Sequence, residues 1–459
     1  MNPILMYSVA ILAVALVIYM LLKKADVKIT LFGVGMVLMI IAILNGVEVV
    51  EGSNNVIIDP IVSVIDAFKG QLGRAGFIIL ILGGYTAYMN KIGANEVTVS
   101  VLTKPLKNIK SPYVLVPIVF LLGQLLSLVI PSASNLAIIL LATLYPVLKA
   151  SGMSNLTAAG VIATTATVMP TPLGSDNVAI AEALNMSVSE YVFQHHARIS
   201  IPAILVMAIV HFFWQKYMDK KSGLINEKGI AESNEVKEIK GGALFKTVYA
   251  ILPLLPILIL LGSFVVNQFT NADLKLSVEV VSVMSFIIAL VCELFRRRNG
   301  KTVLEETDSF FKGMGNAMGT VALLVAATTF VNGLKAIGLI NSLQTAMTTA
   351  NASGIVLPLI LVGLTALIVL LSGSGTALTF AMIPLYAPLA AAASISPLLL
   401  TLTVGLTGNI LRAMSPVSAV VNIVAGSTKE EPIDIVKRTA VPMLAGVVTV
   451  LVLSVIFYL

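Results

Sequence analysis

Long apolar stretches separated by short polar turns run along the whole chain. Residues 3–22, 29–44 and 441–459 approach or reach the roughly 20 apolar residues that cross a bilayer as a helix. The pattern predicts an all-α polytopic membrane protein with five transmembrane helices in each half. We expect the ten crossings near residues 3–22, 29–48, 70–90, 155–185, 199–217, 247–267, 277–295, 313–334, 396–426 and 439–458.

Two further apolar stretches, residues 113–149 and 353–392, lie between the third and fourth crossings of each half. Each has a polar break near its middle, at 131–135 and at 372–376. Two full spans and a turn need roughly 40 or more residues, so these two stretches are barely long enough to cross the membrane twice. We therefore expect re-entrant hairpins with tips near the membrane midplane. Two ordinary crossings joined by a tight turn remain the alternative, because both arrangements leave the flanks on one side.

The two halves repeat their polar breaks in the same order. Pro131-Ser132-Ala133-Ser134-Asn135 corresponds to Ser372-Gly373-Ser374-Gly375-Thr376, and Thr171-Pro172 corresponds to Ser415-Pro416 at a similar offset. An odd number of crossings in the first half inverts the second half in the membrane. Matched helix breaks in two inverted repeats are the best sequence indication of a transporter binding site.

The charge distribution gives the orientation. Hydrophobic residues make up 58% of the chain and charged residues 11%, against about 25% charged residues in soluble domains. Cytoplasmic loops of membrane proteins carry an excess of Lys and Arg, so the net charge of +6 reflects topology rather than nucleic-acid binding. With both termini outside, the predicted cytoplasmic segments, Arg438 included, hold every Lys and Arg except Lys69, Arg74, Arg198, Lys275, Lys335 and Arg412.

These crossings divide the chain into repeat 1 at residues 1–217, a polar cytoplasmic linker at 218–245 and repeat 2 at 246–459. In this orientation the first hairpin opens to the cytoplasm and the second to the outside. Cys292 is the single cysteine, which excludes an internal disulfide. No charged region precedes the first apolar stretch, so we expect a retained helix rather than a cleaved signal peptide.

The hairpin tips are the first candidate site. Glycine and serine let the backbone break, and irregular backbone at membrane depth survives where it is buried in protein or lines a wet cavity. The helices that begin at such breaks present amides and positive dipole ends that suit carboxylates. Small residues also mediate plain helix packing, which is the alternative. The candidate substrate ligands at the tips are Ser132, Ser134, Asn135, Ser372, Ser374 and Thr376.

The fourth crossing of each half is also interrupted, at residues 169–177 and 407–418. The first break carries Asp176 and the second Arg412, and ionisable residues inside a span are costly and functional by default. Arg412 suits a bidentate grip on a substrate carboxylate, with Ser415 beside it. Asp176 suits a sodium ion or a proton, with Ser175 and Asn177 as its neighbours. The alternative is a structural pair between Asp176 and Arg412.

The remaining polar residues give weaker indications of a functional role. His195, His196 and His211 show no partnered ligand pattern, so we expect them at the membrane interface. No Walker sequence, Gly-rich dinucleotide fingerprint or zinc-type His pair is present, and no metal is expected beyond a sodium ion. An intramembrane enzyme needs a catalytic cluster at membrane depth, and the sequence offers one acid–base pair. A channel is a further alternative.

The chain resembles the anaerobic C4-dicarboxylate uptake C (DcuC) family, within the ion-transporter superfamily of dicarboxylate and citrate carriers. The resemblance covers nearly the whole chain. It rests on stretches that include Ala87-Tyr88-Met89, Lys104-Pro105-Leu106, Ala142-Thr143-Leu144-Tyr145-Pro146-Val147, His211-Phe212-Phe213-Trp214-Gln215-Lys216-Tyr217-Met218-Asp219-Lys220-Lys221, Ser372-Gly373-Ser374-Gly375, Ser415-Pro416-Val417-Ser418 and Val436-Lys437-Arg438-Thr439. The segments 131–135 and 171–176 match the family pattern loosely.

The resemblance implies a homodimer in the bacterial inner membrane. Each protomer would have a static scaffold domain and a mobile transport domain that works as an elevator. The implied function is secondary transport of fumarate, succinate or malate by cation symport or exchange, without a cofactor. A carrier of the same fold for an amino acid or another small carboxylate is the alternative. Direction, coupling ion and stoichiometry stay open.

Overall fold

The computed structural model describes residues 2–50, 55–109, 111–223, 242–270, 274, 276–342, 345 and 354–459. Within these ranges the protein is built from helices, and no strand occurs among them. Ten helical stretches of the described chain are long and apolar enough to cross a membrane. The chain is therefore a multi-pass membrane protein, as the hydrophobic pattern predicted.

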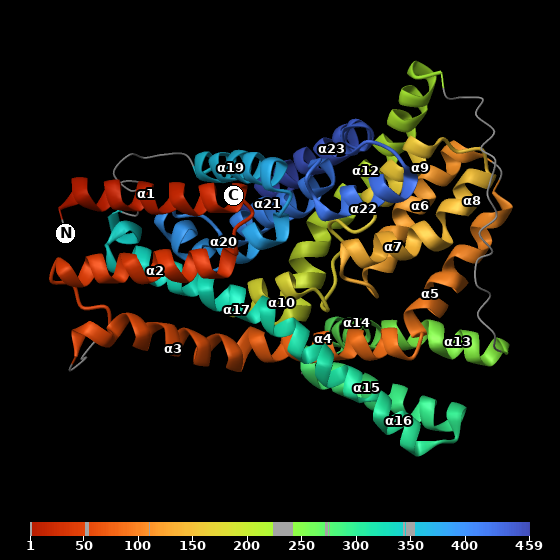
Figure 1. Cartoon of the computed structure of the whole chain (residues 1–459), viewed down its shortest axis with the longest axis horizontal. Helices are drawn as coiled ribbons and strands as arrows, with labels where there is room; N and C mark the ends of the chain where they lie inside the picture. The colour runs from red at the N-terminus through yellow and green to blue at the C-terminus, as the bar shows by residue number, and fades with distance from the viewer. Residues whose placement is uncertain are drawn as a thin grey trace.

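The first half of the described chain contains twelve α-helices, most of which are labelled in Figure 1. Their bounds are α1 Pro3–Leu22, α2 Val27–Leu44, α3 Asp59–Gln71, α4 Phe77–Lys91, α5 Ala94–Thr103, α6 Pro112–Ser127, α7 Ala133–Thr143, α8 Tyr145–Ala150, α9 Asn155–Ala163, α10 Ser175–Ala183, α11 Val188–Glu190 and α12 Ala197–Lys221. A π-helical segment, Leu72–Gly76, joins α3 to α4, and another, Tyr191–His196, joins α11 to α12. Both junctions extend a crossing beyond the bounds expected from hydropathy.

The second half follows a similar order of long and broken helices. Their bounds are α13 Ala243–Ile251, α14 Leu255–Phe269, α15 Val278–Arg297, α16 Gly300–Glu306, α17 Asp308–Ala336, α19 Val356–Ser372, α20 Gly375–Ala392, α21 Pro397–Leu411, α22 Ala419–Thr428 and α23 Pro432–Tyr458. The helical segment Gly300–Ala336 is longer than the predicted crossing 313–334. Segments 94–110 and 339–350 mix polar and apolar residues after the third crossing of each half, a pattern that predicts interfacial helices. The helix α5 lies inside the first segment, and part of the second lies outside the described residues.

The predicted interruptions of the fourth crossings are confirmed. In the first half, residues 164–174 separate α9 from α10 and are not helical. In the second half, α21 passes into a short 3₁₀ turn, Arg412–Met414, before α22 begins at Ala419. Pro170, Pro172 and Gly174 in the first segment and Pro416 in the second remove backbone donors or favour breaks, which explains why the pattern was visible in the sequence.

The count of ten spans agrees with the prediction, but two assignments differ. The interrupted crossing 155–185 is not among the ten stretches, because α9 and α10 have 9 residues each, and α20, which was assigned to the second hairpin, is long enough to cross. The helices α6 and α19 contain 16 and 17 residues, so they reach about 24 to 26 Å, less than the ~30 Å hydrocarbon core. Re-entrant hairpins therefore remain a proposal.

The helices pack into two groups. The long helix α17 packs against α2, α3 and α4, and α15 packs against α4. On the other side, α21 packs against α19, α20 and α23, and α12 packs against α6 and α23. Figure 1 shows the first group along the lower edge and the second group above it. The breaks lie in the second group, where α20 touches α17 and α10 touches α4.

Candidate binding site in the broken helices

The two helix breaks and the second hairpin tip enclose a cavity of about 110 Å³. Asp176 and Thr171 line it from the first half, and Thr376, Asn409 and Arg412 line it from the second. Three separate segments of the chain therefore meet in one small space. Polar groups converging in a cavity between broken helices are typical of a transporter binding site.

Asp176 joins the two halves of the chain at this cavity. It lies in the first turn of α10, where the positive end of the helix dipole stabilises a carboxylate. Its Oδ1 accepts a hydrogen bond from the Asn177 amide at 3.0 Å, and its Oδ2 accepts one from Asn409 Nδ2 at 3.0 Å. Asn409 had no predicted role, although it lay within the predicted second break.

Arg412 is held in the cavity by two oxygen atoms. Its Nη2 donates to the carbonyl of Ala166 at 2.5 Å, and its Nη1 donates to Thr376 Oγ1 at 3.3 Å. These contacts connect the second break to the first break and to the tip before α20. A guanidinium carries more N–H donors than two contacts use, so the others are available to a ligand.

Arg412 and Asp176 do not form an ion pair with one another. Both line the same cavity, and their hydrogen bonds go to Ala166, Thr376, Asn177 and Asn409. The structure therefore does not support the alternative in which the two charges serve as a structural pair. An acid and a base are each held in place around an open space.

The first hairpin tip lies beside the cavity rather than in it. Ser132 caps α7 by accepting a hydrogen bond from the Asn135 amide at 3.4 Å. Ser132 and Asn135 are exposed, and Ser134 is half-buried. Of this tip, Pro131 lines the cavity. In this conformation the structure does not place the three predicted polar side chains against Arg412.

The second tip packs tightly onto the second break. Gly373 has a φ of 73°, in the left-handed region, and a Cβ there would lie 2.7 Å from Ser418 Cα. A Cβ on Gly375 would lie 2.0 Å from the carbonyl oxygen of Gly408. Ser372 Oγ accepts a hydrogen bond from the Ser374 amide at 3.2 Å, and neither serine lines the cavity. Thr376 is the predicted tip residue that reaches Arg412.

The remaining predicted ligands divide between the cavity and its walls. Ser175 lines the cavity at the start of α10. Asn177 also lines the cavity. Its Nδ2 donates to the Thr171 carbonyl at 2.9 Å, and this hydrogen bond connects the start of α10 to the non-helical segment before it. Ser415 is buried and donates to the Leu370 carbonyl at 2.9 Å, so it joins the second break to α19.

The interfacial placement predicted for the histidines is wrong for two of the three. His196 is 3% exposed and lines the cavity, and His211 is fully buried. His196 was misplaced because the crossing predicted from 199 extends back to Val188, which brings residues 195 and 196 inside the helical stretch. Nδ1 of His196 contacts Ser200 Oγ at 3.0 Å, so Nε2 is the ring nitrogen available to the cavity.

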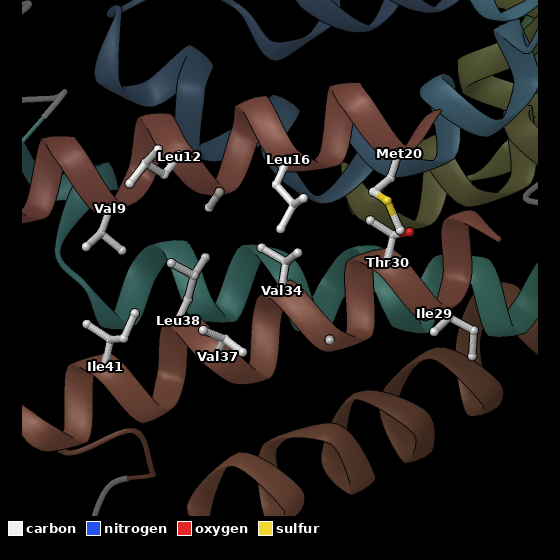
Figure 2. A pocket seen from close by; sticks show the side chains of 12 residues that line it. Val9, Leu12, Leu16, Met20, Ile29, Thr30, Val34, Val37, Leu38 and Ile41 are labelled. Carbon is white, nitrogen blue, oxygen red and sulfur yellow. The ribbon is translucent and has the colours of Figure 1, made fainter. Parts of the chain in front are cut away.

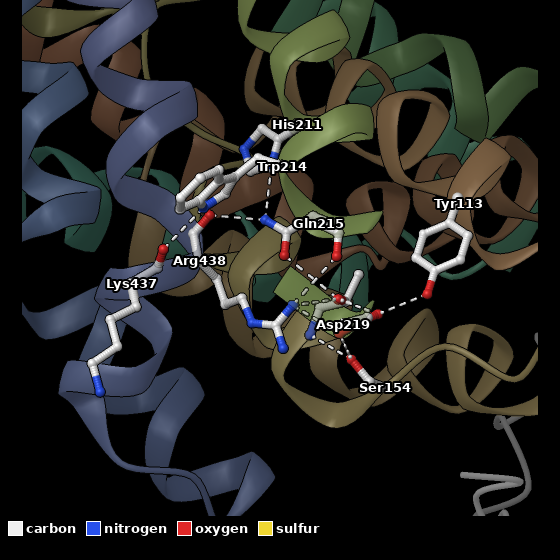
Figure 3. A network of polar contacts seen from close by, with 9 residues as sticks. Tyr113, Ser154, His211, Trp214, Gln215, Asp219, Lys437 and Arg438 are labelled. Carbon is white, nitrogen blue, oxygen red and sulfur yellow. Dashed lines mark hydrogen bonds and ion pairs between the residues drawn. The ribbon is translucent and has the colours of Figure 1, made fainter. Parts of the chain in front are cut away.

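A second buried polar cluster lies outside the cavity (Figure 3). Arg438 Nη1 and Asp219 Oδ1 form an ion pair of 2.7 Å, and their side chains are 1% and 3% exposed. Asp219 also accepts hydrogen bonds from Ser154 Oγ at 2.8 Å and Thr157 Oγ1 at 2.9 Å. The cluster joins α9, α12 and α23.

Arg438, which was counted among the predicted cytoplasmic basic residues, is buried rather than exposed in a loop. The helix α23 begins at Pro432, one and a half turns before Arg438, so the side chain lies within the helix bundle. Its place beside Asp219 depends on the contact between α12 and α23, which sequence spacing does not reveal. Gln215 Nε2 supports the pair by donating to the Arg438 carbonyl at 2.8 Å.

Solved transporter structures share this fold. The YdaH transporter of Alcanivorax borkumensis superimposes with a TM-score of 0.57 at 16% identity, covering 86% of this chain and 87% of the other. MtrF of Neisseria gonorrhoeae, from a class of antimetabolite efflux pumps, gives a TM-score of 0.60 at 13% identity, covering 94% and 95%. Similarity at these identities shows the fold alone.

Sequence relatives identify the family. A model of the C4-dicarboxylate anaerobic carrier family matches residues 4–459. A probable anaerobic C4-dicarboxylate transporter of Vibrio cholerae is 37% identical over 436 residues, 94% of this chain and 92% of that protein. The anaerobic C4-dicarboxylate transporter DcuC of Escherichia coli K12 is 37% identical over 427 residues, 92% and 90%. These relatives are transporters, not enzymes, and the chain belongs to the C4-dicarboxylate anaerobic carrier family, DcuC.

Proposed function

We propose that the protein is a secondary transporter of C4-dicarboxylates such as fumarate, succinate or malate. The observation that carries this proposal is the placement of Arg412 in a cavity between two broken helices, with guanidinium donors left for a ligand. A planar guanidinium matches a carboxylate through two parallel hydrogen bonds. The amide ends of α10 and α20 begin at the same cavity and favour a second negative group.

Charge balance favours a coupling cation. Apart from the titratable His196, the charged side chains that line the cavity are Arg412 and Asp176, one of each sign. A dicarboxylate dianion therefore enters a cavity that is neutral overall, and moving uncompensated charge through the bilayer is costly. A sodium ion or a proton at Asp176 would offset part of the negative charge of the dianion, and unwound backbone carbonyls would be further ligands for a sodium ion. Exchange of one dianion for another would balance the charge as well.

The packing supports an elevator in which one helix group moves against the other. The cavity is built from α10, α20 and the α21–α22 break, which belong with α6, α12, α19 and α23. We infer that this group is the transport domain. The helices α2, α4, α15 and α17 would then form the scaffold domain of a homodimer in the bacterial inner membrane.

An amino-acid substrate is the second candidate, because the same cavity holds an acid and a base. A zwitterion would place its carboxylate at Arg412 and its ammonium group at Asp176. A C4-dicarboxylate would instead compete with Asp176 for positive charge. The two substrates therefore make opposite demands on Asp176: an amino acid needs the bare carboxylate, whereas a dicarboxylate needs it neutralised.

Counterflow in proteoliposomes tests the proposal. Vesicles preloaded with unlabelled succinate should accumulate labelled succinate, fumarate or malate transiently, with sodium and pH varied independently. Excess aspartate should compete through its two carboxylates, whereas alanine and acetate should not. Accumulation of a neutral amino acid but no dicarboxylate would establish the second candidate. Flux without counterflow would indicate a channel.

A further inference from the structure

A long apolar groove lies between α1 and α2, outside the candidate binding site. It has a volume of about 480 Å³, and Leu12, Leu16, Ile29 and Val37 in its lining are exposed. Figure 2 shows Val9 facing Ile41 at one end and Met20 facing Thr30 at the other. The groove is therefore open along its length between two membrane-spanning helices.

The length of the groove matches one leaflet of a bilayer. Val9 and Met20 are eleven residues apart on α1, which corresponds to about 16 Å at a rise of about 1.5 Å per residue. Half of the ~30 Å hydrocarbon core is about 15 Å. An acyl chain lying along the groove would thus pass from the membrane midplane to the surface near the α1–α2 turn.

That turn carries positive charge. The groove face of α1, formed by Val9, Leu12, Leu16 and Met20, continues at helical spacing to Lys23. Lys23 and Lys24 are exposed. Both therefore stand at the surface end of the groove, where a lipid headgroup would lie.

The other charged groups of the turn offset one another. Lys28 Nζ lies 3.0 Å from Asp26 Oδ2. The hydrogen bond from the Lys28 side chain lowers the pKa of the Asp26 carboxyl, as do the backbone amides of Ile29 and Lys28. Asp26 therefore remains ionised and pairs with Lys28. Lys23 and Lys24 are left as the uncompensated charges.

We propose that this groove binds one anionic phospholipid, with an acyl chain along α1 and α2 and the phosphate at Lys23 and Lys24. The apolar walls explain the acyl chain, and the two lysines explain selection for a negative headgroup over a zwitterionic one. The site is independent of the transported substrate. A second copy of the chain seated in the groove is the competing occupant.

The test uses the full-length protein in nanodiscs of equal phosphatidylglycerol and phosphatidylethanolamine, with retained lipid measured by native mass spectrometry. The wild type should retain phosphatidylglycerol preferentially. The double variant Lys23→Gln/Lys24→Gln should lose that preference, by about fivefold for each lysine. The double variant Lys220→Gln/Lys221→Gln removes an adjacent, exposed lysine pair at the end of α12 and should keep it.

A second pair of variants tests the groove itself. Gly33 lines the groove, and a Cβ there would meet nothing within 4 Å, so Gly33→Leu should fill the space without a clash. It should lose bound phosphatidylglycerol. Gly262→Leu, on an exposed face of α14 with equal free space, should retain the lipid. Both variants should give the wild-type size-exclusion profile.

Three results would overturn the proposal. The first is equal retention of both lipids by the wild type, and the second is unchanged phosphatidylglycerol on Gly33→Leu. The third is dissociation of a dimer by Gly33→Leu with no change in bound lipid, which would make the groove an interface between copies. The lysine variants give an independent reading if Gly33→Leu does not fold, because Lys23 and Lys24 are exposed.

Discussion

At the scale of single residues, the site depends on two charges that are held apart. Arg412 is oriented by the Ala166 carbonyl and Thr376, and Asp176 by Asn177 and Asn409. Each anchor comes from a different segment of the chain, so the geometry follows from the fold rather than from local sequence. Substitutions at these two residues should therefore change transport in different ways.

Arg412→Lys keeps the positive charge but loses the planar fork. The ammonium group reaches one oxygen at a time, so a hydrogen bond to the carboxylate is lost, worth about 1.5–3 kcal/mol. We expect the KM of succinate counterflow to rise about tenfold to hundredfold, and Arg412→Ala to abolish counterflow. Arg74→Lys, at an exposed arginine outside the cavity, serves as the control. An unchanged KM in Arg412→Ala would make Arg412 structural.

Asp176→Asn should alter ion dependence more than substrate choice. The amide keeps a hydrogen-bond acceptor for Asn409 but removes the negative charge that a sodium ion or proton requires. Dicarboxylate counterflow measured against sodium and pH should lose its dependence on one of them. Glu182→Gln, an acid on the same helix α10 that does not line the cavity, should keep the wild-type profile. A wild-type profile in Asp176→Asn would place the coupling site elsewhere.

At the scale of helices, the sequence predicted interruptions better than lengths. Proline, glycine and paired serines marked the breaks at 164–174 and 412–418, because these residues act on the local backbone. Hydropathy did not predict that the crossing predicted at 199–217 begins at Val188, since α11 and the π-helical segment are more polar. That error removed His196 from the predicted site. Asn409 was missed because its partner is distant in sequence.

Gly375 tests how closely the second tip must approach the second break. A methyl group there would lie 2.0 Å from the Gly408 carbonyl oxygen, and two backbone segments would have to separate. Gly375→Ala should therefore displace Thr376 from Arg412, lowering counterflow and thermal stability together. Gly363→Ala, on α19 with nothing within 4 Å of the added methyl, should be neutral in both assays. Full counterflow in Gly375→Ala would show that the contact is dispensable.

The Asp219–Arg438 pair should stabilise the group of helices that carries the cavity. Arg438→Met leaves Asp219 as a buried charge without its partner, a change that costs about 3–5 kcal/mol. The unfolding temperature in detergent should fall sharply, and Asp219→Asn/Arg438→Met should recover part of the loss. Lys437→Met removes the preceding exposed lysine and should have little effect. Equal stability of Arg438→Met and the wild type would exclude a stabilising role.

At the scale of the whole molecule, the two halves begin at opposite ends. Figure 1 shows α1 starting near one end of the long axis and α13 near the other. The parity of the predicted crossings implies an inverted second half, and that inversion stays a prediction. The sequence did not reveal how the two helix groups pack, because contacts such as α17 with α2 and α12 with α23 join segments distant in the chain.

Cysteine labelling tests the orientation of both halves together. In a Cys292→Ala background, Ser222→Cys and Gly300→Cys lie at exposed positions on the predicted cytoplasmic side, and Asn55→Cys and Thr270→Cys on the predicted outer side. In intact cells an impermeant maleimide should label the outer pair and spare the inner pair, and disruption of the membrane should expose all four. The excess of lysine and arginine on one side explains the expected orientation in the membrane, since lysine and arginine residues are retained in the cytoplasm during insertion.

Labelling of Ser222→Cys but not Asn55→Cys in intact cells would show the opposite orientation. Labelling that places Asn55→Cys and Thr270→Cys on different sides would mean that the second half is not inverted, and the matched breaks would then lack the symmetry that the proposed site requires.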